Sequence, residues 1–325
     1  MATAMAAGCL LSPPAIGQSR GMPSSVVSVI NYKGGVGKTT LTANIGAELA
    51  ARGRTVLLVD LDPQASLTFS LFRVEDWEAQ LAEERTVLQW YRSFITGGIP
   101  EPLHKYVVCP PAVNKAIQPG DGRLDLLASH LGLIDVDLDL AAGLGGARFQ
   151  RSSPRFLPVH RMLADALSDD AFAAYDMVLI DCPPNFNMVT RTAIVASDHV
   201  LVPARPDYLS TLGIDYLRAR LSGLVESYNG VAPTAINPEI AGVVYTMIQL
   251  AGGSILRAQR AAMERLATIE IPVFRQTIRD NKTAFTDAGD RSVPVVLASE
   301  TTTAMESLRY ELQQLTSEFV AKTRV

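Results

Sequence analysis

Six short apolar runs recur along the chain, and most of them are separated by segments long enough to form a helix. The runs show little alternation of polar and apolar residues, as expected of strands covered on both faces in a parallel sheet. They read VVSVINY (26–32), TVLLVDLDP (55–63), RLDLLAS (123–129), YDMVLIDCPP (175–184), DHVLVPARP (198–206) and IAGVVYTMI (240–248). This order predicts an α/β protein with a doubly wound, mostly parallel sheet, right-handed crossovers and helices on both faces.

The segments between the runs differ in regularity. After the first run, TTLTANIGAELAARG (39–53) has apolar positions at helical spacing and ends on a glycine, which predicts a helix. The stretch 79–155 is interrupted by GG, PP, GDG and GLGG, so we expect surface loops and short helices there. Residues 1–24 are expected to form a flexible tail, and 25–325 a single domain.

A glycine-rich loop joins the first predicted strand to the first predicted helix. It consists of Lys33, Gly34, Gly35, Val36, Gly37, Lys38, Thr39 and Thr40. The general phosphate-loop pattern has a glycine five residues before Gly37, where this chain has Tyr32. The remaining glycines still allow backbone N–H groups to surround phosphate oxygens at a helix N-terminus. We assign Lys38 to the outer phosphates, Thr39 to magnesium and Thr40 to the innermost phosphate, which predicts a P-loop NTPase that binds ATP with Mg²⁺.

Carboxylates follow two of the predicted strands. They are Asp60 and Asp62 in LVDLDP and Asp181 in VLIDCPP. Because ligands of such sheets bind at the carboxyl ends of the strands, these side chains are expected near the glycine loop. A carboxylate there needs a cation, a donor or a proton, and magnesium meets that need. We assign Asp181 and Asp60 to the metal and Asp62 to the attacking water; each alone would also suit a helix cap or turn.

Five segments in this order resemble a known family. NYKGGVGKTT, VLLVDLDPQAS, YDMVLIDCPP, VPARPDYLSTLG and GVVYTM are similar to the ParA/MinD group of deviant Walker A ATPases, and within it to the Soj-like ParA partition ATPases. The resemblance extends from about Val26 to the C-terminus. It implies an ATP-dependent homodimer in which Lys33, the signature lysine, reaches the nucleotide of the partner chain.

The resemblance also implies a function. In this family the ATP-bound dimer binds DNA without sequence preference, and a ParB-like or other adaptor protein stimulates slow, Mg²⁺-dependent hydrolysis, which segregates or positions a cargo. Asp62 matches the hydrolytic aspartate of the family, so the implied catalytic set is Lys33, Lys38 and Asp62. A cytoplasmic, nucleoid-associated protein is expected.

Three segments bear on the details of that function. Gln64-Ala65-Ser66 stands where the family usually has Gln-Gly-Asn, and IQLAGGSILRAQR (248–260) stands where partition proteins usually carry a polar, arginine-bearing loop. RQTIRDNKTAFTDAGD (275–290) resembles the segment that closes the adenine pocket. The residues assigned to the nucleotide on this basis are Met247, Arg279 and Asp280, and the candidate DNA contacts are Arg257, Arg260, Arg275, Arg279 and Lys282.

Composition limits the alternatives. The 325 residues are 48% apolar, and 29 basic against 33 acidic residues give a net charge of −4, so bulk charge does not call for nucleic acid, although a local basic patch would. Cys9, Cys109 and Cys182 are far apart and lack metal-ligand spacing, which argues against a disulfide framework or zinc site. No run of about 18 uninterrupted apolar residues offers a membrane span.

Two other functions use a similar loop. A MinD-like membrane-associated regulator would need a basic amphipathic C-terminal helix; here Met305, Leu308, Leu312, Leu315 and Phe319 form an apolar stripe opposite a face rich in glutamate, which favours a helix packed on the core. A reductase component like the nitrogenase iron protein would need two suitably placed cysteines for an iron–sulfur cluster, and Cys109 and Cys182 are more simply explained as buried or incidental thiols.

Overall fold

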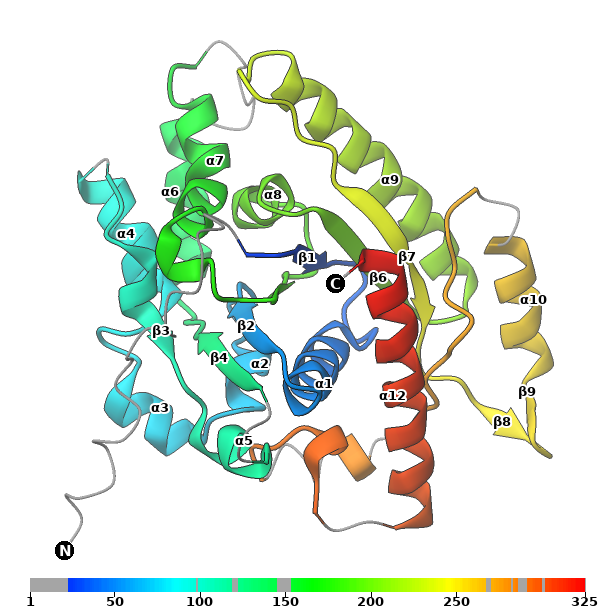
Figure 1. The fold of residues 1–325 in the computed structure, drawn as a ribbon. Helices are drawn as coiled ribbons and strands as arrows, with labels where there is room; N and C mark the ends of the chain where they lie inside the picture. Colours follow the sequence, from blue (N-terminus) through cyan, green and yellow to red (C-terminus); the bar gives the residue numbers. More distant parts are fainter. Residues whose placement is uncertain are drawn as a thin grey trace, which may run out of the picture.

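A single twisted sheet forms the centre of the molecule (Figure 1). The computed structural model describes residues 23–97, 99–118, 122–144, 153–266, 270–281, 283–285, 291–299 and 302–324. Within them, seven strands pair in the order β3-β4-β2-β5-β1-β6-β7. The edge strand β3 runs antiparallel to β4, and the other neighbours are parallel. The predicted doubly wound, mostly parallel α/β fold is therefore confirmed.

The six apolar runs each contain one parallel strand. The strands of the central sheet are β1 (Val26–Val29), β2 (Thr55–Asp60), β3 (Val107–Val108), β4 (Arg123–Leu127), β5 (Met177–Asp181), β6 (His199–Ala204) and β7 (Glu239–Tyr245). The missing alternation has a simple cause, which β5 illustrates. Met177 and Leu179 pack into one hydrophobic cluster, whereas Val178 and Ile180 pack into the other, so every position is buried.

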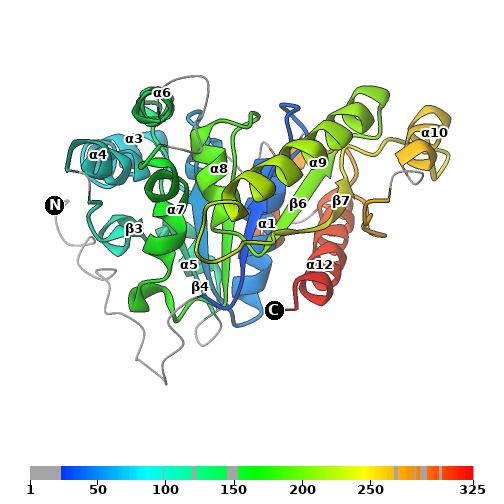
Figure 2. The same ribbon diagram turned by 90° about the horizontal axis from the view of Figure 1, so that it is seen from above.

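Helices cover both faces of the sheet (Figures 1 and 2). One hydrophobic cluster joins the sheet to α4 (Val87–Gly97), α6 (Leu133–Gly143), α7 (Phe156–Leu167), α8 (Met188–Val195) and α9 (Tyr208–Asn229). The other joins it to α1 (Lys38–Ala51), α2 (Ser66–Phe69), α5 (Pro111–Ala116), the 3-10 helix η3 (Val295–Leu297) and α12 (Thr303–Thr323). The remaining short elements are α3 (Val74–Gln80), η1 (Leu103–Tyr106) and η2 (Asp170–Phe172).

The C-terminal helix α12 packs its apolar stripe onto the core. Met305 is 9% exposed, and the four other stripe residues are fully buried beside α1. None of the helices in the described parts of the chain is long and apolar enough to cross a membrane.

The segment that follows β7 contains a small hairpin that the sequence reading did not predict. Strands β8 (Leu250–Ala251) and β9 (Ser254–Ile255) pair antiparallel, and helix α10 (Arg257–Leu266) follows directly. Gly252 and Gly253 both adopt positive φ, 57° and 77°, which suits a tight two-residue turn. Hairpin and helix lie together at one edge of the molecule (Figure 1).

Candidate functional site

The glycine loop connects β1 to α1 at the carboxyl edge of the sheet. Gly35 and Gly37 have φ of 66° and 84°, in the region that glycine adopts without strain. Because α1 begins at Lys38, the free N–H groups of its first turn lie at the end of the loop. An anion at this position would meet both those donors and the positive end of the helix dipole.

The strand register brings the predicted carboxylates to the loop. Asp60 on β2 and Asp181 on β5 are paired residues in neighbouring strands, and Asp181 is also paired with Val29 on β1. Thr39 donates its hydroxyl hydrogen to Oδ2 of Asp181 at 2.6 Å. The other oxygen of Asp181, Oδ1, is buried and has no hydrogen-bond partner among the described residues.

Burial sets the electrostatics of this edge. It raises the pKa of Asp181 to about 7; the hydroxyl of Thr39 and the charge of Lys38 oppose that rise, while Asp62 adds to it. Burial also lowers the pKa of Lys38, against the attraction of Asp181 and Asp62. A further positive charge at this edge would stabilise the ionised forms of Asp181 and Asp62.

Asp60 and Asp62 are two residues apart but have different surroundings. Asp60 is fully buried: Oδ2 accepts hydrogen bonds from the N–H and hydroxyl of Thr68, both at 2.8 Å, and Oδ1 accepts from the N–H of Asp62 at 3.2 Å. Burial and the nearby Asp181 place the pKa of Asp60 well above its usual range. Asp62 is only partly buried and lines the cavity beside the loop, so the two carboxylates have different access to a ligand.

The segment after Asp62 is held in an unusual conformation. Ala65 has φ of 52°, a left-handed conformation that glycine adopts more readily than alanine. This is the position at which the similar family usually has glycine. Ser129 donates to the carbonyl oxygen of Asp62 at 2.6 Å and so ties the segment to the end of β4.

Two adjoining cavities lie on the loop. One, of about 540 Å³, is lined by residues 34–40 and by Asp62. The other, of about 390 Å³, is lined by Met247, Ile278, Arg279 and Asp280. Gly37, Thr40, Met247 and Phe285 line both. The structure thus brings Met247 and the consecutive residues Arg279 and Asp280 together beside the phosphate loop, although all three lie far from that loop in sequence.

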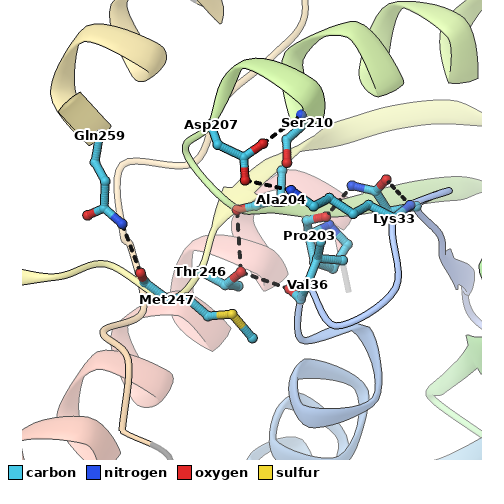
Figure 3. A network of polar contacts seen from close by, with 10 residues as sticks. Lys33, Val36, Pro203, Ala204, Asp207, Ser210, Thr246, Met247 and Gln259 are labelled. Atoms are coloured by element: carbon cyan, nitrogen blue, oxygen red, sulfur yellow. Dashed lines mark hydrogen bonds and ion pairs between the residues drawn. The ribbon is translucent and has the colours of Figure 1, made fainter.

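Thr246 and Phe285 were missed from the sequence. Thr246 donates its hydroxyl hydrogen to the carbonyl of Val36 at 2.7 Å and so joins β7 to the loop (Figure 3). Phe285 lies within the segment that resembles the adenine-closing region, and an aromatic residue there was a usable signal.

Lys33 lines neither of these cavities. Its Nζ is 2.6 Å from Oδ2 of Asp207, with side chains 33% and 38% exposed (Figure 3). Oδ1 of Asp207 accepts from the N–H of Ser210 and caps α9. Although partial burial acts to raise the pKa of Asp207, the hydrogen bonds from Lys33 and Ser210 lower it. Buried Asn31 fixes this end of the loop, since Oδ1 accepts from the N–H of Lys33 and Nδ2 donates to the carbonyl of Pro203.

The candidate DNA contacts do not form one uniform patch. Arg257 and Arg260 are exposed on α10, and Arg275 is exposed beyond β7. Arg279 pairs with Glu311 of α12, with Nη2 to Oε1 at 2.6 Å, so its charge is already compensated. Lys282 lies outside the described residues.

Gln259 of α10 forms a hydrogen bond to Met247, which lines both cavities. Nε2 of Gln259 donates to the carbonyl of Met247 at 3.1 Å (Figure 3). Oε1 of Gln259 accepts from the N–H of Gln249 at 2.8 Å. Met247 itself has φ of 54°, so the chain turns sharply where it passes from the cavity wall to the β8–β9 hairpin.

Comparison with known proteins identifies the family of this chain. Residues 24–231 match the AAA domain family AAA_31. The chain is 32% identical over 228 residues to the chromosome partitioning protein ParA of Caulobacter vibrioides, covering 69% of this chain and 70% of that protein. It is 27% identical to the cell division protein PomZ of Myxococcus xanthus, covering 91% and 79%. A putative replication protein A of Sinorhizobium fredii is 27% identical, and the match spans 58% of its length.

Solved structures agree with the fold. An ATP complex of a variant of Cyanothece McdA superposes with a TM-score of 0.67 at 20% identity, covering 94% of this chain and 98% of that one. A cobyrinic acid a,c-diamide synthase from Mycobacterium smegmatis, solved with an ATP analogue and magnesium, gives 0.59 at 27% identity, covering 82% and 91%. The chain therefore belongs to the AAA domain family and, within it, to the ParA-like partition ATPases.

Proposed function

We propose that this protein is an ATP-driven switch that binds ATP and Mg²⁺, dimerises, binds DNA without sequence preference and positions DNA or another cargo. The observation that carries the proposal is the hydrogen bond between Thr39 and Asp181 beside the cavity on the phosphate loop. The buried Oδ1 of Asp181, which has no partner in the described part of the chain, is an oxygen that a hard cation would satisfy. The residues present therefore fit a magnesium-bound nucleotide.

The roles of the residues follow from their surroundings. Thr39 and Asp181 would hold the metal, and Lys38 with the loop amides would hold the phosphates. A bound Mg²⁺ would neutralise charge on the β- and γ-phosphates. Asp62, which faces the same cavity, would orient the attacking water, because this chemistry depends mainly on positioning and charge stabilisation. Asp60 would act behind the metal through its hydrogen bonds to Thr68 and Asp62.

Dimerisation would change the partner of Lys33. To reach a nucleotide on a second chain, Lys33 must leave Asp207. An ion pair this exposed contributes about 0–1 kcal/mol, so releasing it costs little compared with a new contact to phosphate. The name of the Caulobacter relative, a chromosome partitioning protein, supports DNA as the cargo or track.

Light scattering tests the switch. With ATP and Mg²⁺, wild type and Asp62→Ala are expected to be dimers and Lys38→Ala a monomer, because only the last loses the phosphate contact. Wild-type protein that stays monomeric with saturating ATP and Mg²⁺ would overturn the proposal.

DNA binding is tested by its salt dependence. Replacing Arg257 and Arg260 with Ala should lower the slope of log affinity against log salt by about 2, since each phosphate contact contributes about 1. Arg73→Ala, which removes an exposed charge at the start of α3, is the matched control and should leave the slope unchanged. An unaltered slope in the double variant would remove α10 from the interface.

A further inference from the structure

A third cavity lies on the opposite face of the sheet from α1, among helices α7, α8 and α9. Its volume is about 330 Å³, and its walls include Phe156 and His160 of α7, Phe186 and Arg191 at α8, and Arg220 of α9. Helix α8 lies between the two others in both views of the fold (Figures 1 and 2). We call this cavity the α7–α9 pocket. It shares no lining residue with the two cavities on the phosphate loop.

A buried histidine supplies the pocket with a hydrogen-bond acceptor. The His160 side chain has no exposed surface, and its Nδ1 lies 2.8 Å from the carbonyl oxygen of Phe156. That carbonyl can only accept, so Nδ1 carries the hydrogen and Nε2 of the neutral ring carries a lone pair. Nε2 is buried and has no hydrogen-bond partner within the described ranges. Burial, and secondarily the charge of Arg191, lowers the pKa of His160 to about 4, which keeps the ring neutral at physiological pH.

Two arginines place positive charge in the same pocket. The guanidinium groups of Arg191 and Arg220 both lie over the ring of Phe186, each 5.6 Å from its centre. Burial and the nearby charge of Arg220 lower the pKa of Arg191. Asp137 attracts Arg191, and Nε of Arg191 donates to the carbonyl oxygen of Phe186 at 3.5 Å.

One wall of the pocket contains a glycine of α9. Gly223 lies inside α9 and lines the pocket, and a Cβ added there would meet no atom within 4 Å. Glycine in a helix interior is less favourable than alanine, so the bare backbone at this point is not explained by helix stability.

We propose that the α7–α9 pocket binds a small phosphate monoester, with Arg191 and Arg220 facing its charged oxygens and Nε2 of His160 accepting the hydrogen of its P–OH group. With a second pKa of about 6, a phosphate monoester is mostly the dianion at pH 7 and about one tenth of it carries such a hydrogen, so the pocket would select the monoanion. Planar guanidinium groups match the geometry of phosphate oxygens, and the rings of Phe156 and Phe186 provide apolar walls for the organic part. No residue of the phosphate loop lines this pocket.

A ligand in this pocket would lie close to the N-terminal end of the phosphate loop. The ring of Phe186 stacks on Tyr32, with 6.2 Å between ring centres, and Tyr32 directly precedes Lys33. A ligand against Phe186 therefore contacts a residue that packs on the N-terminal end of the phosphate loop.

The test observes His160 directly. The protein, labelled with ¹⁵N in its histidines and saturated with a non-hydrolysable ATP analogue and Mg²⁺, is titrated with phenyl phosphate, inorganic phosphate and benzoate. We expect a saturable shift of the Nε2 resonance of His160 with phenyl phosphate, while the signals of the three other histidines stay in place. Comparable shifts with inorganic phosphate would identify free phosphate as the ligand, and binding of benzoate without phosphate would overturn the assignment.

Two matched variants give the test its control. Arg220→Gln should weaken phenyl phosphate binding by about tenfold or more, because a charged hydrogen-bond partner is lost. Arg218→Gln, two residues away on α9 and outside the pocket, should leave it within about twofold. Gly223→Leu fills the pocket without altering charge and should abolish the shift. No shift in wild type, or equal affinity in Arg220→Gln, would overturn the proposal.

Discussion

The two ends of the phosphate loop each carry a lysine, but their surroundings differ. Lys38, the first residue of α1, is buried, and Asp181 and Asp62 favour its charged form against the effect of burial. Lys33, at the N-terminal end, is about one-third exposed and pairs with Asp207 of the loop before α9. The same side chain thus occupies a nearly enclosed site at one end of the loop and a partly solvated one at the other.

We expect Lys38 to act within one chain, whereas the role of Lys33 depends on a second chain. A buried ammonium group needs its counter-charges within the same chain, so the position of Lys38 is already determined in the monomer. A partly exposed pair such as Lys33–Asp207 is worth little, and Lys33 can exchange Asp207 for a phosphate without a large loss of stability. Nucleotide binding is accordingly expected to be a property of one chain, and completion of the site a property of two.

Replacing the two lysines tests this difference most directly. Lys38→Ala should weaken ATP binding by about 3–5 kcal/mol, because it removes charged hydrogen bonds to two phosphates. Lys33→Ala should leave ATP affinity of the monomer within about threefold and impair dimerisation instead. Calorimetry at protein concentrations below dimerisation measures both affinities. Equal losses in the two variants would show that Lys33 contacts the nucleotide of its own chain.

Asp62, which lines the cavity beside the loop, is expected to act in hydrolysis and not in nucleotide binding. Asp62→Ala should lower the ATPase rate by about 100-fold, since a misplaced water costs roughly this much, while ATP affinity stays nearly unchanged. Phosphate release and nucleotide titration measure the two quantities. Asp62→Asn, which keeps the size of the side chain, is the control for packing. A normal rate in both variants would remove Asp62 from the mechanism.

Asn31 tests how firmly the N-terminal end is anchored. Asn31→Ala removes the hydrogen bonds to Pro203 and Lys33 and leaves buried groups unpaired, so it should destabilise the fold by about 1–3 kcal/mol. Asn185→Ala, at an exposed position, is the control and should change stability by less than about 0.5 kcal/mol. Urea unfolding measures both. Unchanged stability in Asn31→Ala would mean that the loop is held mainly by other contacts.

The smallest expected effect concerns the partner of Lys33. Asp207→Asn keeps a good helix cap but removes the ion pair, and should tighten the ATP-dependent dimer by up to about fivefold. Asp215→Asn, which removes the charge paired with Arg218 on the same helix, should leave the dimer unchanged. Sedimentation measures the dissociation constants. A weaker dimer in Asp207→Asn would show that Asp207 acts within the dimer instead of holding Lys33 in the monomer.

Much of the fold could be predicted from the sequence, because the pattern of neighbouring residues along the chain determines it. The six apolar runs and the stripe on α12 follow from burial, which imposes a pattern on consecutive residues. The β8–β9 hairpin was missed because each strand has only two residues, too few for a pattern. The two glycines of its turn were the available signal.

The sequence by itself determined the phosphate loop, the strands around it and the carboxylates at their ends, because spacing along a strand–loop–helix unit fixes these positions locally. Only the tertiary structure decided their partners. The pairing of Lys33 with Asp207, the contact of Thr246 with Val36 and the pairing of Arg279 with Glu311 join residues 174, 210 and 32 positions apart. Such contacts depend on strand order and helix packing, and no local pattern records them.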